Sequence, residues 1–177
     1  MPVILVRHTA VAVEPGVCYG ASEVPLADDF PAAAERVRRL LLPPPRARII
    51  SSPSQRCLRL ARVLANGADL TPDPRLLELT FGAWEGRHWD DLPRAEVDAW
   101  SADFVNRAPP GGESFSQLAA RAEDCITDLI SHHSGESLVL VTHAGVIRAL
   151  LASRSELPLR DAFSISVEFG GIYPLVP

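Results

Sequence analysis

Four side chains suited to phosphate chemistry each follow a short apolar run of the sequence. Arg7 and His8 follow the first run, Arg56 lies one helical turn beyond the second, and His143 follows the third. Ligands of open α/β sheets bind outside the carboxyl ends of the strands. We therefore expect these four side chains to meet at one edge of a sheet.

This set of residue types favours an anion pocket. Two guanidinium groups bind oxyanions with paired hydrogen bonds and stay charged. Helices that begin near Pro53 and Ala144 would add free backbone N–H groups and a favourable dipole. Two imidazoles can divide the work, one neutral and nucleophilic, the other donating a hydrogen bond or carrying charge. The arginines could then stabilise the oxygens of a transferring phosphoryl group without a metal.

Each residue also has a plainer explanation when it is taken alone. An Arg-His pair can be an ordinary loop pair, a histidine before a helix can be a cap, and Arg56 can lie on a helix surface. A metal site is the main rival for two histidines. The sequence has no HxH or HExxH motif and no carboxylate-rich metal loop, and two arginines would repel a dication. We expect no metal and no cofactor.

The apolar pattern predicts an α/β fold in which strands alternate with helices. We expect a three-layer α/β/α domain that spans residues 1–177, with a mostly parallel central sheet and helices on both faces. Buried strands are predicted at residues 3–6, 48–51 and 137–142, and weaker ones at 75–79, 165–169 and 172–175. Helices are predicted at residues 31–42, 53–66, 90–100, 114–131 and 144–153.

Local signals place several helix ends. Pro31 can occupy a first turn, and three consecutive prolines at 43–45 stop that helix. Gly67 ends the helix that carries Arg56. Ser114 and Gln117 have the spacing of a capping box, which predicts the start of the longest helix. Residues 9–30 show no clear period and read as a long loop.

Composition narrows the possible functions. All 17 basic residues are arginine, so mechanisms that need a lysine amine are excluded. The formal net charge of −5 disfavours a general nucleic-acid binder, and no apolar run is long enough for a membrane helix. The N-terminal apolar run is too short for a signal peptide. Three scattered cysteines (Cys18, Cys57 and Cys125) favour a reducing compartment. We expect a cytoplasmic protein.

Four motifs in order resemble the histidine phosphatase superfamily, whose fold is phosphoglycerate-mutase-like. The first is the Arg-His pair after the first strand, and the last is a strand that ends in Thr-His-Ala-Gly. Between them stand a Ser-x-x-x-Arg run and a motif similar to L-x-E-x-x-F-G-x-W-E-G. The matching segments are Leu5–Thr9, Ser51–Ala61, Leu76–Gly86 and Val141–Gly145.

The resemblance implies a role for each matching residue. His8 would attack phosphorus and carry a phosphohistidine, while Arg7, Arg56 and His143 would hold the phosphoryl oxygens. Glu78 would protonate the leaving oxygen and then deprotonate the attacking water. The residues alone would not choose Glu78 over Glu85; the family pattern does. Trp84 in the same motif is expected in the core.

Two stretches resemble the alpha-ribazole phosphatases within that superfamily. One is the loop at residues 16–26, and the other is the segment 110–115 that leads into the longest helix. This resemblance implies a phosphomonoesterase that removes the 5′-phosphate of alpha-ribazole phosphate or of its cobalamin-level equivalent. Substrate contacts are then expected from Gly20, Ser22, Glu113 and Ala144. The plainer alternatives are a turn residue for Ser22 and a solvated carboxylate for Glu113.

Two positions depart from the family pattern. Thr9 stands where many relatives have glycine, and Glu14 stands where many have asparagine. A carboxylate that pointed at the phosphate would weaken binding, so the loop must turn Glu14 outward or the phosphate is held differently. The chain also lacks room for the longer insert of bisphosphoglycerate-dependent mutases, which favours hydrolysis over mutase chemistry.

Two other functions remain open from the sequence. A broad-specificity or sugar-phosphate phosphatase would use the same residues. A catalytically inactive phosphoryl-binding module would bind phosphate without turnover. In all three cases the expected partner is a small phosphorylated metabolite, with no nucleic acid and no membrane.

Overall fold

The computed structural model describes residues 2–41 and 47–175. Its centre is a five-stranded sheet in the order β3-β2-β4-β1-β5. The strands are β1 (Val3–Arg7), β2 (Arg48–Ser51), β3 (Leu70–Pro72), β4 (Leu138–Thr142) and β5 (Ile172–Leu175). All neighbours pair in parallel except β5, which runs antiparallel to β1. The predicted mostly parallel sheet is confirmed.

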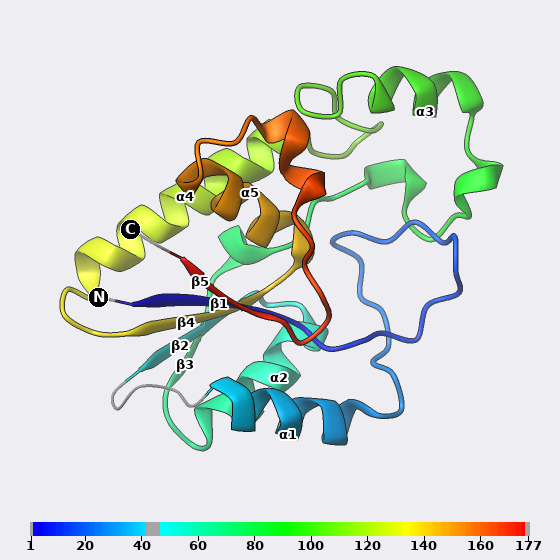
Figure 1. The fold of residues 1–177 in the computed structure, drawn as a ribbon. Helices are drawn as coiled ribbons and strands as arrows, with labels where there is room; N and C mark the ends of the chain where they lie inside the picture. The colour runs from blue at the N-terminus through cyan, green and yellow to red at the C-terminus, as the bar shows by residue number, and fades with distance from the viewer. Residues whose placement is uncertain (1, 42–46, 176–177) are drawn as a thin grey trace.

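Helices cover both faces of the sheet (Figure 1). α1 (Phe30–Leu41) and α2 (Gln55–Ala65) lie on one face, and α4 (Phe115–His132) and α5 (Ala144–Arg154) lie on the other. The alternation of side chains along a strand explains the two layers. Leu5 and Leu140 pack toward α4 and α5, while Val6 and Val141 pack toward α1 and α2.

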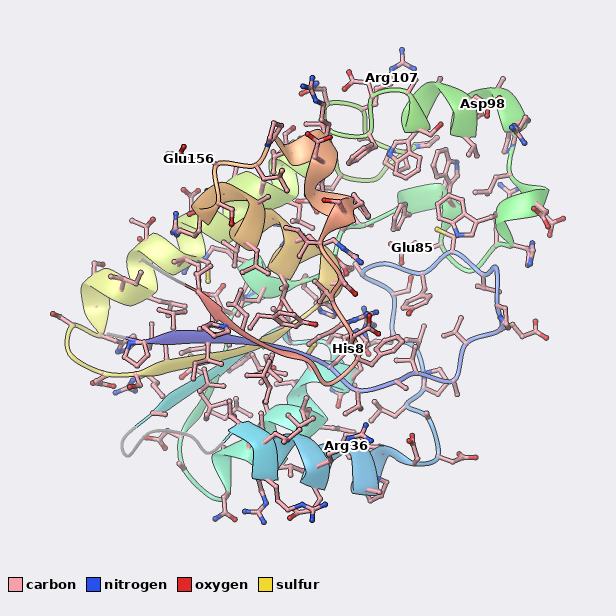
Figure 2. All side chains as sticks on the ribbon, in the orientation of Figure 1. His8, Arg36, Glu85, Asp98, Arg107 and Glu156 are labelled. Carbon is pink, nitrogen blue, oxygen red and sulfur yellow. The ribbon has the colours of Figure 1, made fainter. Side chains whose placement is uncertain are left out.

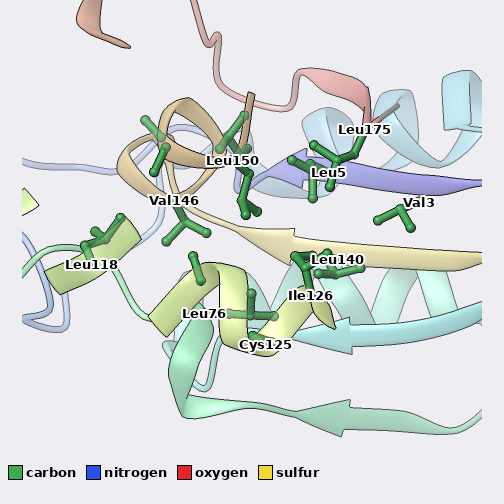
Figure 3. Close-up of a cluster of buried hydrophobic side chains, with 14 of the residues drawn as sticks. Val3, Leu5, Leu76, Leu118, Cys125, Ile126, Leu140, Val146, Leu150 and Leu175 are labelled. Carbon is green, nitrogen blue, oxygen red and sulfur yellow. The ribbon is translucent and has the colours of Figure 1, made fainter. Parts of the chain in front are cut away.

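The larger core lies between the sheet and the α4–α5 pair. Figure 3 shows Leu5 and Leu140 of the sheet close to Ile126 and Leu150 of these helices. All four side chains are fully buried, and each stabilises the fold by roughly 1.5–3 kcal/mol in hydrophobic transfer alone. This core fixes the strand ends that carry the candidate site.

A third, smaller cluster lies outside the sheet layers. It contains the buried residues Cys18, Trp84 and Leu92, and it is extended by partly buried aromatic rings. α3 (Arg94–Ser101) belongs to this region, which projects from one end of the sheet in Figure 1. Trp84 is 1% exposed, so its expected place in the core is confirmed.

Two predicted strands are wrong. Residues 75–79 do not form a strand, because Pro74 begins a 3₁₀ turn at Pro74–Leu76 that Asp73 caps by accepting from the Arg75 N–H. The edge strand is instead β3, just before this turn. Residues 165–169 are irregular, and the carbonyls of Ile165 and Val167 accept hydrogen bonds from arginine side chains in place of a neighbouring strand.

Two helix starts also differ from the prediction. The helix expected from residue 90 is a 3₁₀ turn at Trp89–Asp91 followed by α3, because the residue before Pro93 disfavours helical geometry. α2 begins at Gln55, two residues after Pro53. It ends near the predicted position, with Asn66 as a C-cap in the left-handed conformation. The capping box that opens α4 is confirmed. The predicted stop at residues 43–45 lies outside the described residues.

Candidate active site

The carboxyl ends of β1, β2 and β4 bring together the side chains that the sequence singled out. A cavity of about 230 Å³ lies there, which we call the hollow. Arg7, His8, Arg56 and Glu78 line it, together with four apolar or aromatic residues, Val17, Tyr19, Phe81 and Trp89. Figure 2 labels His8 just beyond the end of β1, with Glu85 in the loop region opposite.

His8 is held in one tautomer by the backbone. Its Nδ1 lies 2.7 Å from the carbonyl oxygen of Thr9. A carbonyl only accepts, so Nδ1 carries the proton and the lone pair of Nε2 is free. Burial lowers the pKa of His8 to about 3, and the nearby Arg56 and Arg7 guanidiniums add to that shift. The imidazole is therefore neutral near pH 7, as a nucleophile requires.

His143 lies directly behind His8 and is completely buried. The two ring centroids are 5.2 Å apart, and Nε2 of His143 lies 2.8 Å from the hydroxyl oxygen of Ser52. Burial lowers the pKa of His143 well below its ordinary value, and the charge of neighbouring groups lowers it further. Neither imidazole carries charge in this arrangement, so His143 has one N–H donor and one acceptor nitrogen.

Cys57 fills the space beside His143. Its Sγ lies 3.5 Å from Nε2 of His143 and 3.5 Å from the carbonyl oxygen of Thr142. Burial raises the pKa of this thiol. The sulfur therefore stays protonated and packs as a small apolar group.

Each arginine donates some of its N–H groups to carbonyls of the protein. Nη1 of Arg7 donates to the carbonyl of Val167 at 2.6 Å, and its guanidinium carbon lies 3.7 Å from the centre of the Phe169 ring. Arg56 donates to the carbonyls of Gly20 and Ser22 at 2.5 and 2.7 Å. Within the described residues, Nε of each arginine is buried with no acceptor. Both arginines line the hollow, so their positive charge would stabilise an anion there.

Glu78 is fixed at the start of α5. Its carboxylate accepts from the backbone N–H of Gly145 and from that of Leu79, both at 3.0 Å. A helix N-terminus favours a negative group. A Cβ at Gly145 would lie 2.3 Å from Oε1 of Glu78, so only glycine leaves the carboxylate in this place.

One N–H at each of the two helix N-termini is already bound by a protein carboxylate. The Gly145 N–H of α5 binds Glu78, and the Gln55 N–H of α2 donates to the carboxylate of Glu23 at 3.0 Å. A helix leaves several N–H groups without a partner at its start, so binding of an anion by the remaining N–H groups stays a prediction.

The four residues expected to contact substrate have other partners. The Ser22 hydroxyl donates to Glu85, and the Gly20 carbonyl accepts from Arg56. Glu113 forms an ion pair with Arg121 at 2.7 Å. None of these side chains lines the hollow, and Ala144 is buried at the first position of α5.

The supporting roles of two residues were not predicted from the sequence, which offered Glu85 only as an alternative acid. Arg121 donates to the carbonyls of Leu77 and Glu78, and so fixes the backbone that carries the acid. Glu85 accepts from the backbone N–H groups of Ala21, Ser22 and Phe81. Burial alone would raise the pKa of Glu85, but these hydrogen bonds and that of the Ser22 hydroxyl lower it. The sequence offers no signal for either role, because both depend on which carbonyls and amides meet in space.

Glu14 is exposed and does not line the hollow. Of the two possibilities that the sequence left open, the loop turns this carboxylate outward. Thr9 is 2% exposed, and its carbonyl is the one that holds His8.

Two general findings complete the description. Within residues 2–41 and 47–175, no three His, Cys, Asp or Glu side chains lie close enough together to hold a metal ion. Among the helices that the structure describes, none combines the length and the apolarity needed to cross a bilayer.

Comparison with known proteins gives a consistent family. The family model described as histidine phosphatase superfamily (branch 1) matches residues 3–176. The adenosylcobalamin/alpha-ribazole phosphatase of Salmonella typhimurium is 31% identical over 172 residues, which cover 94% of this chain and 85% of that protein.

Solved structures with the same fold extend this comparison. The alpha-ribazole phosphatase from Shigella flexneri has a TM-score of 0.89 and 26% identity, with 98% of this chain and 89% of that chain covered. A mycobacterial glucosyl-3-phosphoglycerate phosphatase has a TM-score of 0.85 and 25% identity, with 98% and 88% covered. The phosphoglycerate-mutase-like fold expected from the sequence is confirmed.

Proposed function

The chain belongs to the histidine phosphatase superfamily and is a hydrolase of phosphomonoesters, and from this premise we propose that it works through a phosphohistidine on His8. The observation that supports this most directly is the state of His8 itself. Its Nδ1 proton is committed to the Thr9 carbonyl, and its ring is neutral. The lone pair of Nε2 is therefore available for attack on phosphorus.

In the first step, the Nε2 lone pair forms the N–P bond while the bond from phosphorus to the leaving oxygen breaks. The leaving oxygen takes a proton from Glu78, because the negative charge of the bound phosphate favours the protonated form of this carboxyl. Arg7 and Arg56, which line the hollow, stabilise the charge on the phosphoryl oxygens. His143, which is neutral, donates a ring N–H to one of these oxygens.

In the second step, water attacks the phosphohistidine from the side that the alcohol has left. Glu78, now a carboxylate, takes a proton from this water, the N–P bond breaks, and its electron pair returns to Nε2. Inorganic phosphate leaves, and both His8 and Glu78 regain their starting protonation states. No metal is needed for this sequence, because two guanidinium groups supply the positive charge.

For the substrate, we propose alpha-ribazole 5′-phosphate or its cobalamin-level equivalent. The similarity to alpha-ribazole phosphatases over nearly the whole chain supports this choice. The likeness to the glucosyl-3-phosphoglycerate phosphatase favours a sugar-phosphate phosphatase as the second candidate. A cytoplasmic location stays a prediction. A panel of phosphomonoesters compared by kcat/KM separates the candidates, and a flat profile would remove the narrow assignment.

The nucleophile is tested by rapid acid quench with substrate labelled in its phosphoryl group. We expect an acid-labile labelled protein in the wild type and none in His8→Ala. The same substitution should lower the activity at least about 10⁴-fold. His132→Ala, at the exposed end of α4, is the matched control and should label as the wild type does. Full activity of His8→Ala would rule out His8, and loss of activity with a chelator would rule out a metal-independent reaction.

A further inference from the structure

A turn just before β5 holds the backbone of the Arg7-His8 pair. The Arg7 N–H donates to the Gly171 carbonyl at 3.0 Å, and the His8 carbonyl accepts from the Gly170 N–H, also at 3.0 Å. On its other side, the His8 N–H donates to β4. We call residues 167–171 the clasp; they lie beside the end of β1 in Figure 1. The pair is thus fixed from two sides, by the sheet and by the clasp.

The clasp has a defined shape of its own. The Gly171 N–H donates to the Glu168 carbonyl at 2.9 Å, which closes a tight turn. Gly170 has a φ of +68°, a left-handed conformation that glycine adopts without strain. The Glu168 N–H donates to the Tyr173 hydroxyl at 2.6 Å. Phe169 therefore stands at the tip of a turn that is anchored before any substrate binds.

Phe169 lies against both catalytic side chains of the pair. The guanidinium carbon of Arg7 is 3.7 Å from the centre of its ring, and the ring centroid of His8 is 5.5 Å away. The ring is outside the lining of the hollow and is 40% exposed. It therefore contributes less to the core than a fully buried ring does. Its close partners are instead two side chains that the proposed reaction uses.

The two arginines of the hollow are held in different ways. Arg56 donates to two backbone carbonyls, and each of them takes an N–H group. Arg7 donates to one carbonyl, that of Val167 in the clasp. Its second support is the Phe169 ring, and an aromatic ring attracts a guanidinium by its face. Contact with the face uses no N–H donor, so Arg7 keeps these groups for an oxyanion.

The ring also limits the movement of Arg7. An arginine side chain has several rotatable bonds, and it loses that freedom when it must meet a substrate in one position. The carbonyl of Val167 fixes one edge of the guanidinium, and the Phe169 ring fixes its plane. The cation is therefore oriented in the lining of the hollow before a phosphate arrives.

We propose that Phe169 is a positioning residue of the phosphatase reaction, which holds the guanidinium plane of Arg7 in place for the phosphoryl oxygens. The inference rests on the proposed function, in which Arg7 stabilises the charge on these oxygens. Stabilisation of a transition state depends on donors that are already in place when the charge develops. A more mobile Arg7 should therefore slow phosphoryl transfer in a protein that still folds.

The test uses p-nitrophenyl phosphate, whose leaving group needs little protonation, so that kcat/KM reports on the contacts to the phosphoryl group. Phe169→Leu keeps an apolar side chain but removes the aromatic face, and we expect kcat/KM to fall about 3- to 30-fold. Phe169→Tyr keeps the face and should stay within about twofold of the wild type. Retention of activity by the tyrosine separates the aromatic face from apolar bulk.

A double-mutant cycle shows whether Phe169 acts through Arg7. In an Arg7→Ala background, Phe169→Leu should change kcat/KM by less than about twofold, because the group that the ring orients is gone. Phe163→Leu is the matched control, since this exposed ring also packs on an arginine, Arg148, and lies outside the hollow. It should keep the wild-type kcat/KM.

The inference is overturned, and the phosphatase assignment left standing, by wild-type kcat/KM in Phe169→Leu, by an equal loss in Phe169→Tyr, or by an equal loss in the Arg7→Ala background. Thermal melting checks that each variant folds, and Phe169→Met replaces the leucine variant if that one does not. A wild type that hydrolyses neither p-nitrophenyl phosphate nor any other phosphomonoester overturns the proposed function and this inference with it.

Discussion

The two walls of the hollow are built in different ways. The cationic wall (Arg7, His8 and Arg56, with His143 behind them) stands on the ends of strands and on the first turn of α2. His8, Arg56 and His143 are 2%, 1% and 0% exposed. The apolar wall (Val17, Tyr19, Phe81 and Trp89) stands on loops joined by a few backbone hydrogen bonds, and its rings are partly exposed.

This difference separates the wall that carries out the phosphoryl chemistry from the wall that contacts the alcohol. Strand ends that are locked by parallel pairing hold reacting groups to within fractions of an ångström. Loops tolerate exchange of side chains without loss of the core. One rigid wall can therefore keep the same phosphoryl chemistry while the other wall decides which alcohol enters.

Arg56 joins the walls, so its removal should disturb both the reaction and the loop. Its side chain comes from the α2 side but donates to two carbonyls of the loop that contains Tyr19. We expect Arg56→Ala to lower kcat/KM by about 10³, because it removes a transition-state donor and frees the loop. It should also destabilise the fold by roughly 1–3 kcal/mol, because two carbonyls lose their donor.

Arg62→Ala is the control, since it changes an exposed arginine of the same helix. Steady-state kinetics and thermal melting separate the two effects. If Arg56→Ala kept wild-type kcat/KM, the two walls would be independent of each other and Arg56 would have no part in catalysis.

The burial of His8 predicts how stability depends on pH. Its pKa in the folded protein is about 3, below the value of about 6.5 for an unfolded chain. Between these values the unfolded state binds more protons, so stability is complete above pH 6.5 and falls as the pH drops toward 3. The contribution of this one group approaches about 1.4 kcal/mol per pH unit in that window.

Urea unfolding at several pH values between 4 and 7 checks this prediction. His8→Asn should flatten the slope of unfolding free energy against pH, whereas His132→Asn, at an exposed position, should not. An unchanged slope in His8→Asn would mean that the imidazole ionises freely in the folded protein, which would contradict a water-poor cationic wall.

The cationic wall could be predicted from the sequence because its positions follow from local rules. A short apolar run predicts a buried strand, and the residue after it then stands at the sheet edge. Arg7, His8 and His143 obey this rule, and they lie where it places them. Arg56 lies in the first turn of the helix that follows β2, so the same rule places it at this edge as well.

The apolar wall could not be predicted in the same way. Tyr19 and Trp89 are 70 positions apart, and only the pairing of two irregular loops brings both to the hollow. The alternation of Val17, Cys18 and Tyr19 is a weak strand signal. It lies in a stretch without a clear hydrophobic period, so the sequence did not predict an extended segment there. The two wrong strands have a similar cause, since proline and arginine side chains there satisfy the backbone in place of a ladder.

Gly145→Ala tests the junction where Glu78 meets the cationic wall. The new methyl group would collide with the end of a flexible carboxylate and push it from its place, without touching the core. We expect kcat/KM to fall about 10- to 100-fold with a melting temperature within a few degrees of the wild type. If displacement of the acid is the cause, adding Glu78→Gln should bring little further loss. Wild-type activity would show that the carboxylate acts from another position.

The smallest effect is expected from Glu14, which belongs to the same loop as Tyr19 but faces solvent. Charges that are separated by water interact weakly and are screened by salt. Glu14→Asn, which introduces the residue found in many relatives, should change kcat/KM by less than about twofold at physiological salt. The measurement is repeated at low salt, where removal of a distant carboxylate should lower KM slightly. A rise in kcat/KM of tenfold or more at physiological salt would mean that this loop turns inward when substrate is bound. Part of the loop would then belong to the phosphate site as well as to the surface that contacts the alcohol.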